Sequence, residues 1–134
     1  DFRCRISQDL ADDLSNHYER QARDLVQSIL RKQQEQLVEI MQTIKTNCAT
    51  ETVTENGEIK IKRKKLYEST LTRAQELINT FREFNLTEDT KLESARSEFE
   101  ALLDGVTIEK LRDSDTMRLN VQEGIDDILK KFGM

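Results

Sequence analysis

The residue types that carry chemistry in proteins are sparse and scattered in this sequence. His17 is the only histidine, so histidine-rich metal sites and the usual zinc-ligand spacings are absent. Asp13 lies four residues before His17 on one helical face, as two members of a metal site would, but we interpret the two as an ordinary surface pair. The four glycines stand alone and form no phosphate-binding loop. We therefore expect no catalytic residue, no metal ligand and no cofactor, and we predict that the protein is not an enzyme.

The two cysteines, Cys4 and Cys48, flank a long predicted helix. If this helix is continuous, their Cα atoms lie tens of Å apart, whereas a disulfide needs about 6 Å. We expect no disulfide within one chain. A bridge between antiparallel partner chains is the alternative, which the reducing conditions of the cytosol disfavour.

One cluster of charge does stand out, in the stretch TVTENGEIKIKRKK at residues 52–65. Asn56-Gly57 is a preferred type I′ turn pair between two short alternating runs, and it predicts a β-hairpin arm over residues 51–62. Its face of Thr52, Thr54, Ile59 and Ile61 is suited to packing on a helix or on a second molecule, because an isolated hairpin is marginal in water. We further expect the basic run to continue into a second helix that begins at residue 64.

The basic run allows two interpretations. Its five cations against Glu58 give residues 58–65 a net charge of +4, so the rest of the chain carries −9 of the total of −5. In one interpretation these residues contact nucleic-acid phosphates; in the other, which we prefer, they are solvated or paired with acids of a neighbouring helix. Acids flank the turn at the tip of the arm, and they disfavour contact with phosphates there. The candidate nucleic-acid contacts are Lys60, Lys62, Arg63, Lys64 and Lys65.

The elements that position this arm are predicted from hydrophobic periodicity. Apolar residues three or four apart predict one helix of about 40 residues over 7–47, with Ser7 as its N-cap and Gln33 in a polar inward position. Further helices are predicted over 64–84, over 88–103 with Thr87 as N-cap, and over 107–132 with a break near Asp113-Ser114. The fold class is therefore all-α: an elongated helical bundle with one very long N-terminal helix, a β-hairpin arm and two to three further helices.

Composition agrees with a single helical domain, since the 134 residues are 35% charged and include no proline and four glycines. No apolar run approaches the roughly 18 residues that span a bilayer. We expect a soluble, cytoplasmic protein without membrane contact. Because the chain begins at Asp1 rather than at a methionine, we expect it to be a fragment of a longer protein.

The lengths of the helices predict self-association. A second helix of about 20 residues covers only about 30 Å of the first, and the third helix turns away, so part of the first apolar stripe has no cover unless the last helices fold over it. We expect a second chain to cover it, giving a dimer, with another protein as the alternative partner. The candidate oligomer interface consists of Leu10, Leu14, Tyr18 and Leu25.

The C-terminal half carries one resemblance. The stretch LTRAQELINTFREFNLTEDTKLESARSEFEALL, followed by a short IEKLR segment and a final helix, resembles an uncharacterised family of helical proteins from bacteriophages and mobile elements over residues 66–132. The resemblance implies a phage or plasmid setting and assigns no activity and no functional residues. Together with the periodicity, it favours a non-catalytic scaffold, oligomerisation or protein-interaction domain, with a nucleic-acid accessory domain as the alternative.

Overall fold

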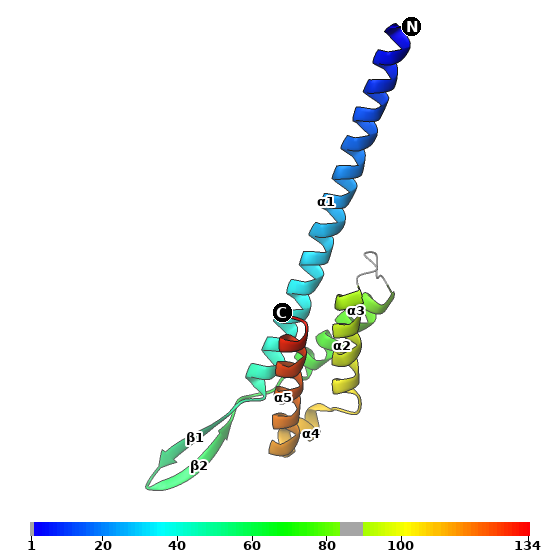
Figure 1. The fold of residues 1–134 in the computed structure, drawn as a ribbon. Coiled ribbons are helices and arrows are strands. Elements are labelled where there is room, and N and C mark those ends of the chain that lie inside the picture. The colour runs from blue at the N-terminus through cyan, green and yellow to red at the C-terminus, as the bar shows by residue number, and fades with distance from the viewer. Residues whose placement is uncertain (1, 84–89) are drawn as a thin grey trace.

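The computed structural model describes residues 2–83 and 90–134 as a four-helix body from which a helix and a hairpin project (Figure 1). The long helix α1 spans Phe2–Asn47 and leads into the hairpin strands β1 (Thr50–Glu55) and β2 (Glu58–Arg63). Then follow α2 (Glu68–Glu83), α3 (Thr90–Leu103), the short α4 (Ile108–Asp113) and α5 (Asp115–Lys131). The predicted all-α class, with a very long first helix and a hairpin arm, is confirmed.

The core of the body is built from the C-terminal end of α1 and the four later helices. Within the described residues, α1 contacts α2 and α5, and α3 contacts the same two helices, which closes a four-helix arrangement. Phe99 of α3 is completely buried at its centre. The other large side chains that are fully buried come from the end of α1, from α4 and from α5, and are Leu37, Met41, Cys48, Leu111, Val121 and Ile125. The C-terminal part of the first apolar stripe therefore meets the stripes of the later helices in one core.

The hairpin has the predicted turn and register. Asn56 and Gly57 both have positive φ, 52° and 80°, as a type I′ turn requires. Antiparallel pairing runs from Glu55 opposite Glu58 to Thr50 opposite Arg63, one residue further at each end than predicted. The arm therefore begins almost directly after α1.

The break before the last helix is also confirmed. The side chain of Thr107 accepts a hydrogen bond from the amide of Lys110 and starts α4, and the side chain of Ser114 accepts one from the amide of Met117 and starts α5. Each hydroxyl satisfies an amide that a helix start leaves without an intrahelical partner. The two caps fix a sharp change of direction between α4 and α5.

Two predicted helix starts are wrong. Ser7 is not an N-cap, because α1 already begins at Phe2 and Ser7 lies inside it. The second helix begins at Glu68 rather than at residue 64, since residues 64–67 form an extended link that bonds back to the body. The predicted N-cap Thr87 and the first residues of the predicted third helix lie outside the described residues.

Candidate interaction site

The N-terminal half of α1 projects from the body into solvent. Every residue from Phe2 to Ser28 is exposed, and the first half-buried position is Ile29. These 27 residues form a rod of about 40 Å, at ~1.5 Å per residue, which extends well beyond the later helices (Figure 1). None of the helices in the described part of the chain covers it.

The four residues of the candidate oligomer interface lie on this projecting half. Leu10, Leu14, Tyr18 and Leu25 are exposed by 58, 47, 65 and 62%. The first alternative weighed from the sequence, that the last helices fold over them, is therefore excluded. Scattered exposed apolar residues are ordinary on a protein surface, but a row of them along one helix is typical of a docking face.

This row continues into the body. Leu14 and Leu25 are 11 residues apart and are followed after the same interval by Gln36, while Tyr18 and Ile29 are followed by Ile40. Eleven residues make about three turns, so each series stays on one face of the helix. We call the face that carries Leu10, Leu14, Tyr18, Ala22, Leu25 and Ile29 the α1 row.

A groove of about 380 Å³ lies between α1 and α2, beyond the end of the α1 row. Gln36 and Ile40, which continue the row, form part of its α1 wall together with Glu39. The α2 wall consists of Arg73, Glu76, Leu77 and Thr80. The groove therefore lies on the same face of α1 as the row, about two turns beyond its last residue.

Gln33 marks the place where the exposed rod enters the body. It occupies a half-buried inward position, as predicted, and its Oε1 atom is buried without a hydrogen-bond partner among the described residues. Burying a polar atom without a partner costs free energy. The point where the rod meets the body thus carries a polar atom that is unsatisfied within the described part of the chain, as does Glu98 of α3 through its Oε2.

The hairpin arm projects from the other end of α1 (Figure 1). Ile59 and Ile61 are exposed by 76 and 63%, so their face does not rest on any described helix of this chain. Of the two supports considered for this face, a helix of the same chain is excluded. A second molecule remains as a prediction.

The five residues of the basic run have different surroundings. Lys60 and Lys62 both lie 3.9 Å from the carboxylate of Glu55, while the ammonium of Lys65 lies over the ring of Tyr67, 5.3 Å from its centre. Lys64 belongs to the link after β2, and its carbonyl accepts hydrogen bonds from Arg118. Glu51 is opposite Lys62 in the register, but the carboxylate that lies 3.9 Å from the ammonium of Lys62 is that of Glu55.

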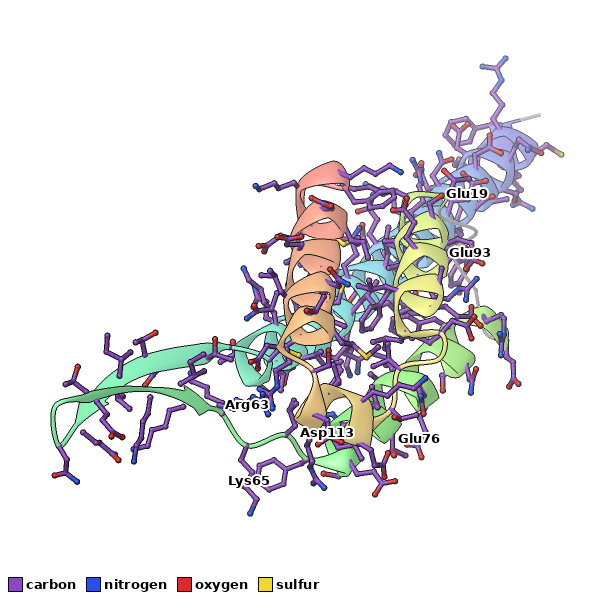
Figure 2. All side chains as sticks on the ribbon, turned by 90° about the horizontal axis from the view of Figure 1, so that it is seen from below. Glu19, Arg63, Lys65, Glu76, Glu93 and Asp113 are labelled. Carbon is purple, nitrogen blue, oxygen red and sulfur yellow. The ribbon has the colours of Figure 1, made fainter. Side chains whose placement is uncertain are left out.

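Arg63 joins the arm to the body and is not available to a ligand in the way the lysines are. Its Nε donates to Asp115 at 2.7 Å and its guanidinium also donates to the carbonyl of Arg112 at 2.6 Å. The hydrogen bond between the two side chains raises the pKa of Arg63 and lowers the pKa of Asp115. Figure 2 shows Arg63 where the arm meets the body and Lys65 at the outer edge.

Two buried arginines escaped the sequence reasoning. Arg118 is 3% exposed and donates to the carbonyls of Leu111 at 2.6 Å, Asn47 at 3.3 Å and Lys64 at 3.4 Å. It therefore ties together the ends of α1 and α4 and the link that follows the arm. A signal was present, because Arg118 lies three residues before the core residue Val121, on the same helical face.

The second buried arginine, Arg96, is held by two acids of its own helix. It donates to Glu93 and Glu100, and Glu100 also accepts from Arg82 of α2. The hydrogen bond from Arg96 lowers the pKa of Glu93 and raises that of Arg96. Arg96 lies on the apolar stripe, three residues before Phe99, so its position in the sequence already indicated that it is buried.

Neither cysteine forms a disulfide: Cys4 is exposed and Cys48 is buried in the core. Burial raises the pKa of the Cys48 thiol to about 11, against the smaller opposing effect of the positive charge of Arg118. The thiolate is the reactive form, so Cys48 is inert near neutral pH. Cys4 is the exposed thiol of the chain.

Residues 2–83 and 90–134, which the structure describes, also bear on metal and membrane sites. Within this part of the chain no group of three or more His, Cys, Asp or Glu side chains is arranged to hold a metal ion. No helix described there is both long and apolar enough to cross a membrane. The strongest candidate site is thus the α1 row with its adjoining groove.

Comparison with known proteins adds no further assignment. No family model, no curated protein sequence and no solved structure matches this chain. The resemblance of residues 66–132 to phage and mobile-element proteins stays a prediction. The geometry of the described residues is therefore the basis for any functional conclusion.

Proposed function

We propose that the protein is a non-catalytic oligomerisation domain, and that the projecting half of α1 is its interface with a second copy. The observation that carries this proposal is the α1 row, a continuous apolar series on a helix of which 27 consecutive residues are exposed. A helix this exposed is marginal in water by itself, because most helical stability comes from packing of an apolar face. A partner along the row supplies that packing.

The size of the apolar surface suits a reversible dimer. Full burial of a large apolar side chain is worth about 1.5–3 kcal/mol, and roughly half of each of Leu10, Leu14, Tyr18 and Leu25 is exposed. Each therefore contributes about 1 kcal/mol, and two copies together contribute on the order of 10 kcal/mol. Association costs at least about 4 kcal/mol in lost freedom of motion. The balance of about 4–6 kcal/mol corresponds to a weak dimer with a dissociation constant between about 1 mM and about 40 μM.

The experiment is sedimentation of the wild-type chain and two double variants at about 1 mM, near the upper end of the expected dissociation constants. We expect the wild type to have about twice the chain mass of 15.7 kDa. Leu14→Glu with Leu25→Glu should shift it to one chain, because the glutamates would have to be buried in the interface. A wild-type mass of one chain at this concentration would refute the proposal.

A matched control separates interface effects from charge effects. Asn16 and Gln27 are also 11 residues apart, but they lie on the opposite face of the same part of α1. Asn16→Glu with Gln27→Glu adds the same charge and should leave the dimer intact. If both double variants dissociate the dimer equally, the α1 row is not the interface. If the wild type associates only with another protein, the row is a docking face for that protein.

A nucleic-acid accessory role is the alternative function. It would rest on Lys60, Lys62, Lys64 and Lys65, since Arg63 is engaged with Asp115. Glu55 lies near the first two lysines, and the tip carries Glu55 and Glu58. These acids weaken the attraction of the arm for phosphate, so we favour the oligomerisation domain. A phage or mobile-element origin would be compatible with either function.

A further inference from the structure

We infer that the two copies pair antiparallel along α1, with a two-fold axis between residues 19 and 20, and that the N-terminal turns of each chain reach the α1–α2 groove of the other. This inference rests on the proposed dimer and adds the orientation and register of the partner. Two independent patterns on the projecting helix lead to the same axis.

The first pattern is charge. Residues 6–19 contain four acids and no Lys or Arg, so their net charge is −4. Residues 20–32 contain four cations and one acid, so their net charge is +3. A parallel, in-register pair would place each block against its own copy, and like charges repel. An antiparallel pair places the acidic block of each chain beside the basic block of the other, and the boundary lies between residues 19 and 20.

The second pattern is the spacing of the α1 row itself. If residue 19 lies across from residue 20 of the partner, Leu10 faces Ile29 and Leu14 faces Leu25. Tyr18 and Ala22 then lie opposite one another to within one residue, so the largest side chain of the row meets the smallest. Alternation of large and small residues fills an interface without voids. All six residues of the row are paired in this register, twice over by symmetry.

In this register the N-terminal turns of α1 in each chain lie near the α1–α2 groove of the other chain. In the same register the first two turns of each chain reach the level of residues 33–37 of the partner, where the groove begins. Residues 2–8 include Arg3 and Arg5 and no acid. The groove walls carry Glu39 and Glu76 against the single cation Arg73. The positively charged residues Arg3 and Arg5 thus approach the mouth of a groove with acidic walls.

In this arrangement the dimer is a helical rod with one body at each end. Residue 41, at the centre of the α1 part of the core, would lie about 43 residues from its symmetry mate, or about 65 Å along the shared rod. The hairpin arms project from the ends of α1 that face away from the dimer axis (Figure 1). The dimer would therefore hold two arm-bearing bodies apart at a fixed distance.

Spin labels on the projecting helix test the orientation directly. Cys4 is exposed whereas Cys48 is buried with a raised pKa, so a thiol-reactive label goes to Cys4 in the wild-type chain. The second site is Gln8→Cys in a Cys4→Ser background, and Gln8 is also exposed. Each labelled chain is first sedimented to establish that it is still a dimer, and the distance between the two labels is then measured by pulsed electron resonance.

The expected distances follow from the helical rise of about 1.5 Å per residue. The proposed register gives about 45–50 Å between the labels at residue 4 and about 35 Å between those at residue 8. A parallel dimer gives about 10–20 Å at both sites, and this result would overturn the antiparallel inference while leaving the proposed dimer in place. Label distances that shorten from residue 4 to residue 8, as in any antiparallel pair, but that place the two-fold axis far from residue 19 would overturn the register. Labelled and unlabelled chains that all sediment as single molecules would refute the dimer itself.

Discussion

Replacement of Arg118 by methionine should strongly destabilise the body of the protein. Arg118 is almost completely buried, and it donates to the carbonyls of Leu111, Asn47 and Lys64. Asn47 is the last residue of α1 and Leu111 lies near the end of α4, where carbonyls have no intrahelical partner. Methionine fills much of the same volume but donates no hydrogen bond, so all three carbonyls lose this donor.

The magnitude follows from these three carbonyls. A hydrogen bond from a charged group contributes about 1.5–3 kcal/mol, but two of the three bonds are long, at 3.3 and 3.4 Å, and count for less. Methionine also removes the cost of keeping a charge away from water. We therefore expect a loss of about 3 kcal/mol in the free energy of unfolding. That is a large part of the 5–15 kcal/mol typical of a small domain.

The assay is urea unfolding followed by circular dichroism at 222 nm, with Arg112→Met as the matched control. Arg112 lies on the exposed side of α4 and donates to one carbonyl, that of Leu66, at 3.3 Å. Its replacement should cost less than about 1 kcal/mol, as is usual for surface positions. An Arg118→Met variant that unfolds within 1 kcal/mol of the wild type would refute the view that Arg118 holds α1, α4 and the arm together. An equal loss of unfolding free energy in both variants would show that the effect does not depend on the burial of Arg118.

Two further predictions concern charge. The lowered pKa of Glu93 means that its pairing with Arg96 stabilises the fold above pH 4.5, and that this contribution is lost as the pH falls below it. Glu93→Gln should therefore flatten the acid side of a stability–pH profile measured by thermal unfolding. An unchanged profile would contradict this role of Glu93. Replacement of Lys62, Lys64 and Lys65 by Gln, with Arg63 kept, should change the free energy of unfolding by less than about 1 kcal/mol. If the wild type shifts DNA or RNA in 150 mM salt and this variant does not, the accessory-domain alternative replaces the oligomerisation domain.

The sequence predicted the elements of the fold well, because each has a local cause. Asn56-Gly57 dictates the turn, and every residue of the hairpin register follows from it. Thr107 and Ser114 are hydroxyl residues placed where a helix begins, and the break between α4 and α5 follows. The exposure of Leu14 and Leu25 was predicted from the lengths of the helices alone.

Features that depend on distant parts of the chain were not predictable in this way. The acceptors of Arg118 are carbonyls up to 71 residues away, and no local pattern indicates them. Arg63 was assigned to the basic run because its neighbours are lysines, but its partner Asp115 lies 52 residues further along. The start of α2 was misplaced because Lys64 is tied to distant parts of the chain, which periodicity cannot show: its amide donates to the carbonyl of Ala49, and its carbonyl accepts from Arg118.

The buried, unpaired Oε1 of Gln33 has a consequence for how the molecule opens. It lies where α1 leaves the core, so the hydrogen-bonded turns above it can unwind without disturbing Leu37 or any residue below. Native proteins open in such cooperative units, each with its own free energy. Amide hydrogens of residues 2–28 should therefore exchange with solvent in one step, and those of the body in another. Only the first step should slow down as the protein concentration rises, because partner binding and folding of the rod are then a single equilibrium.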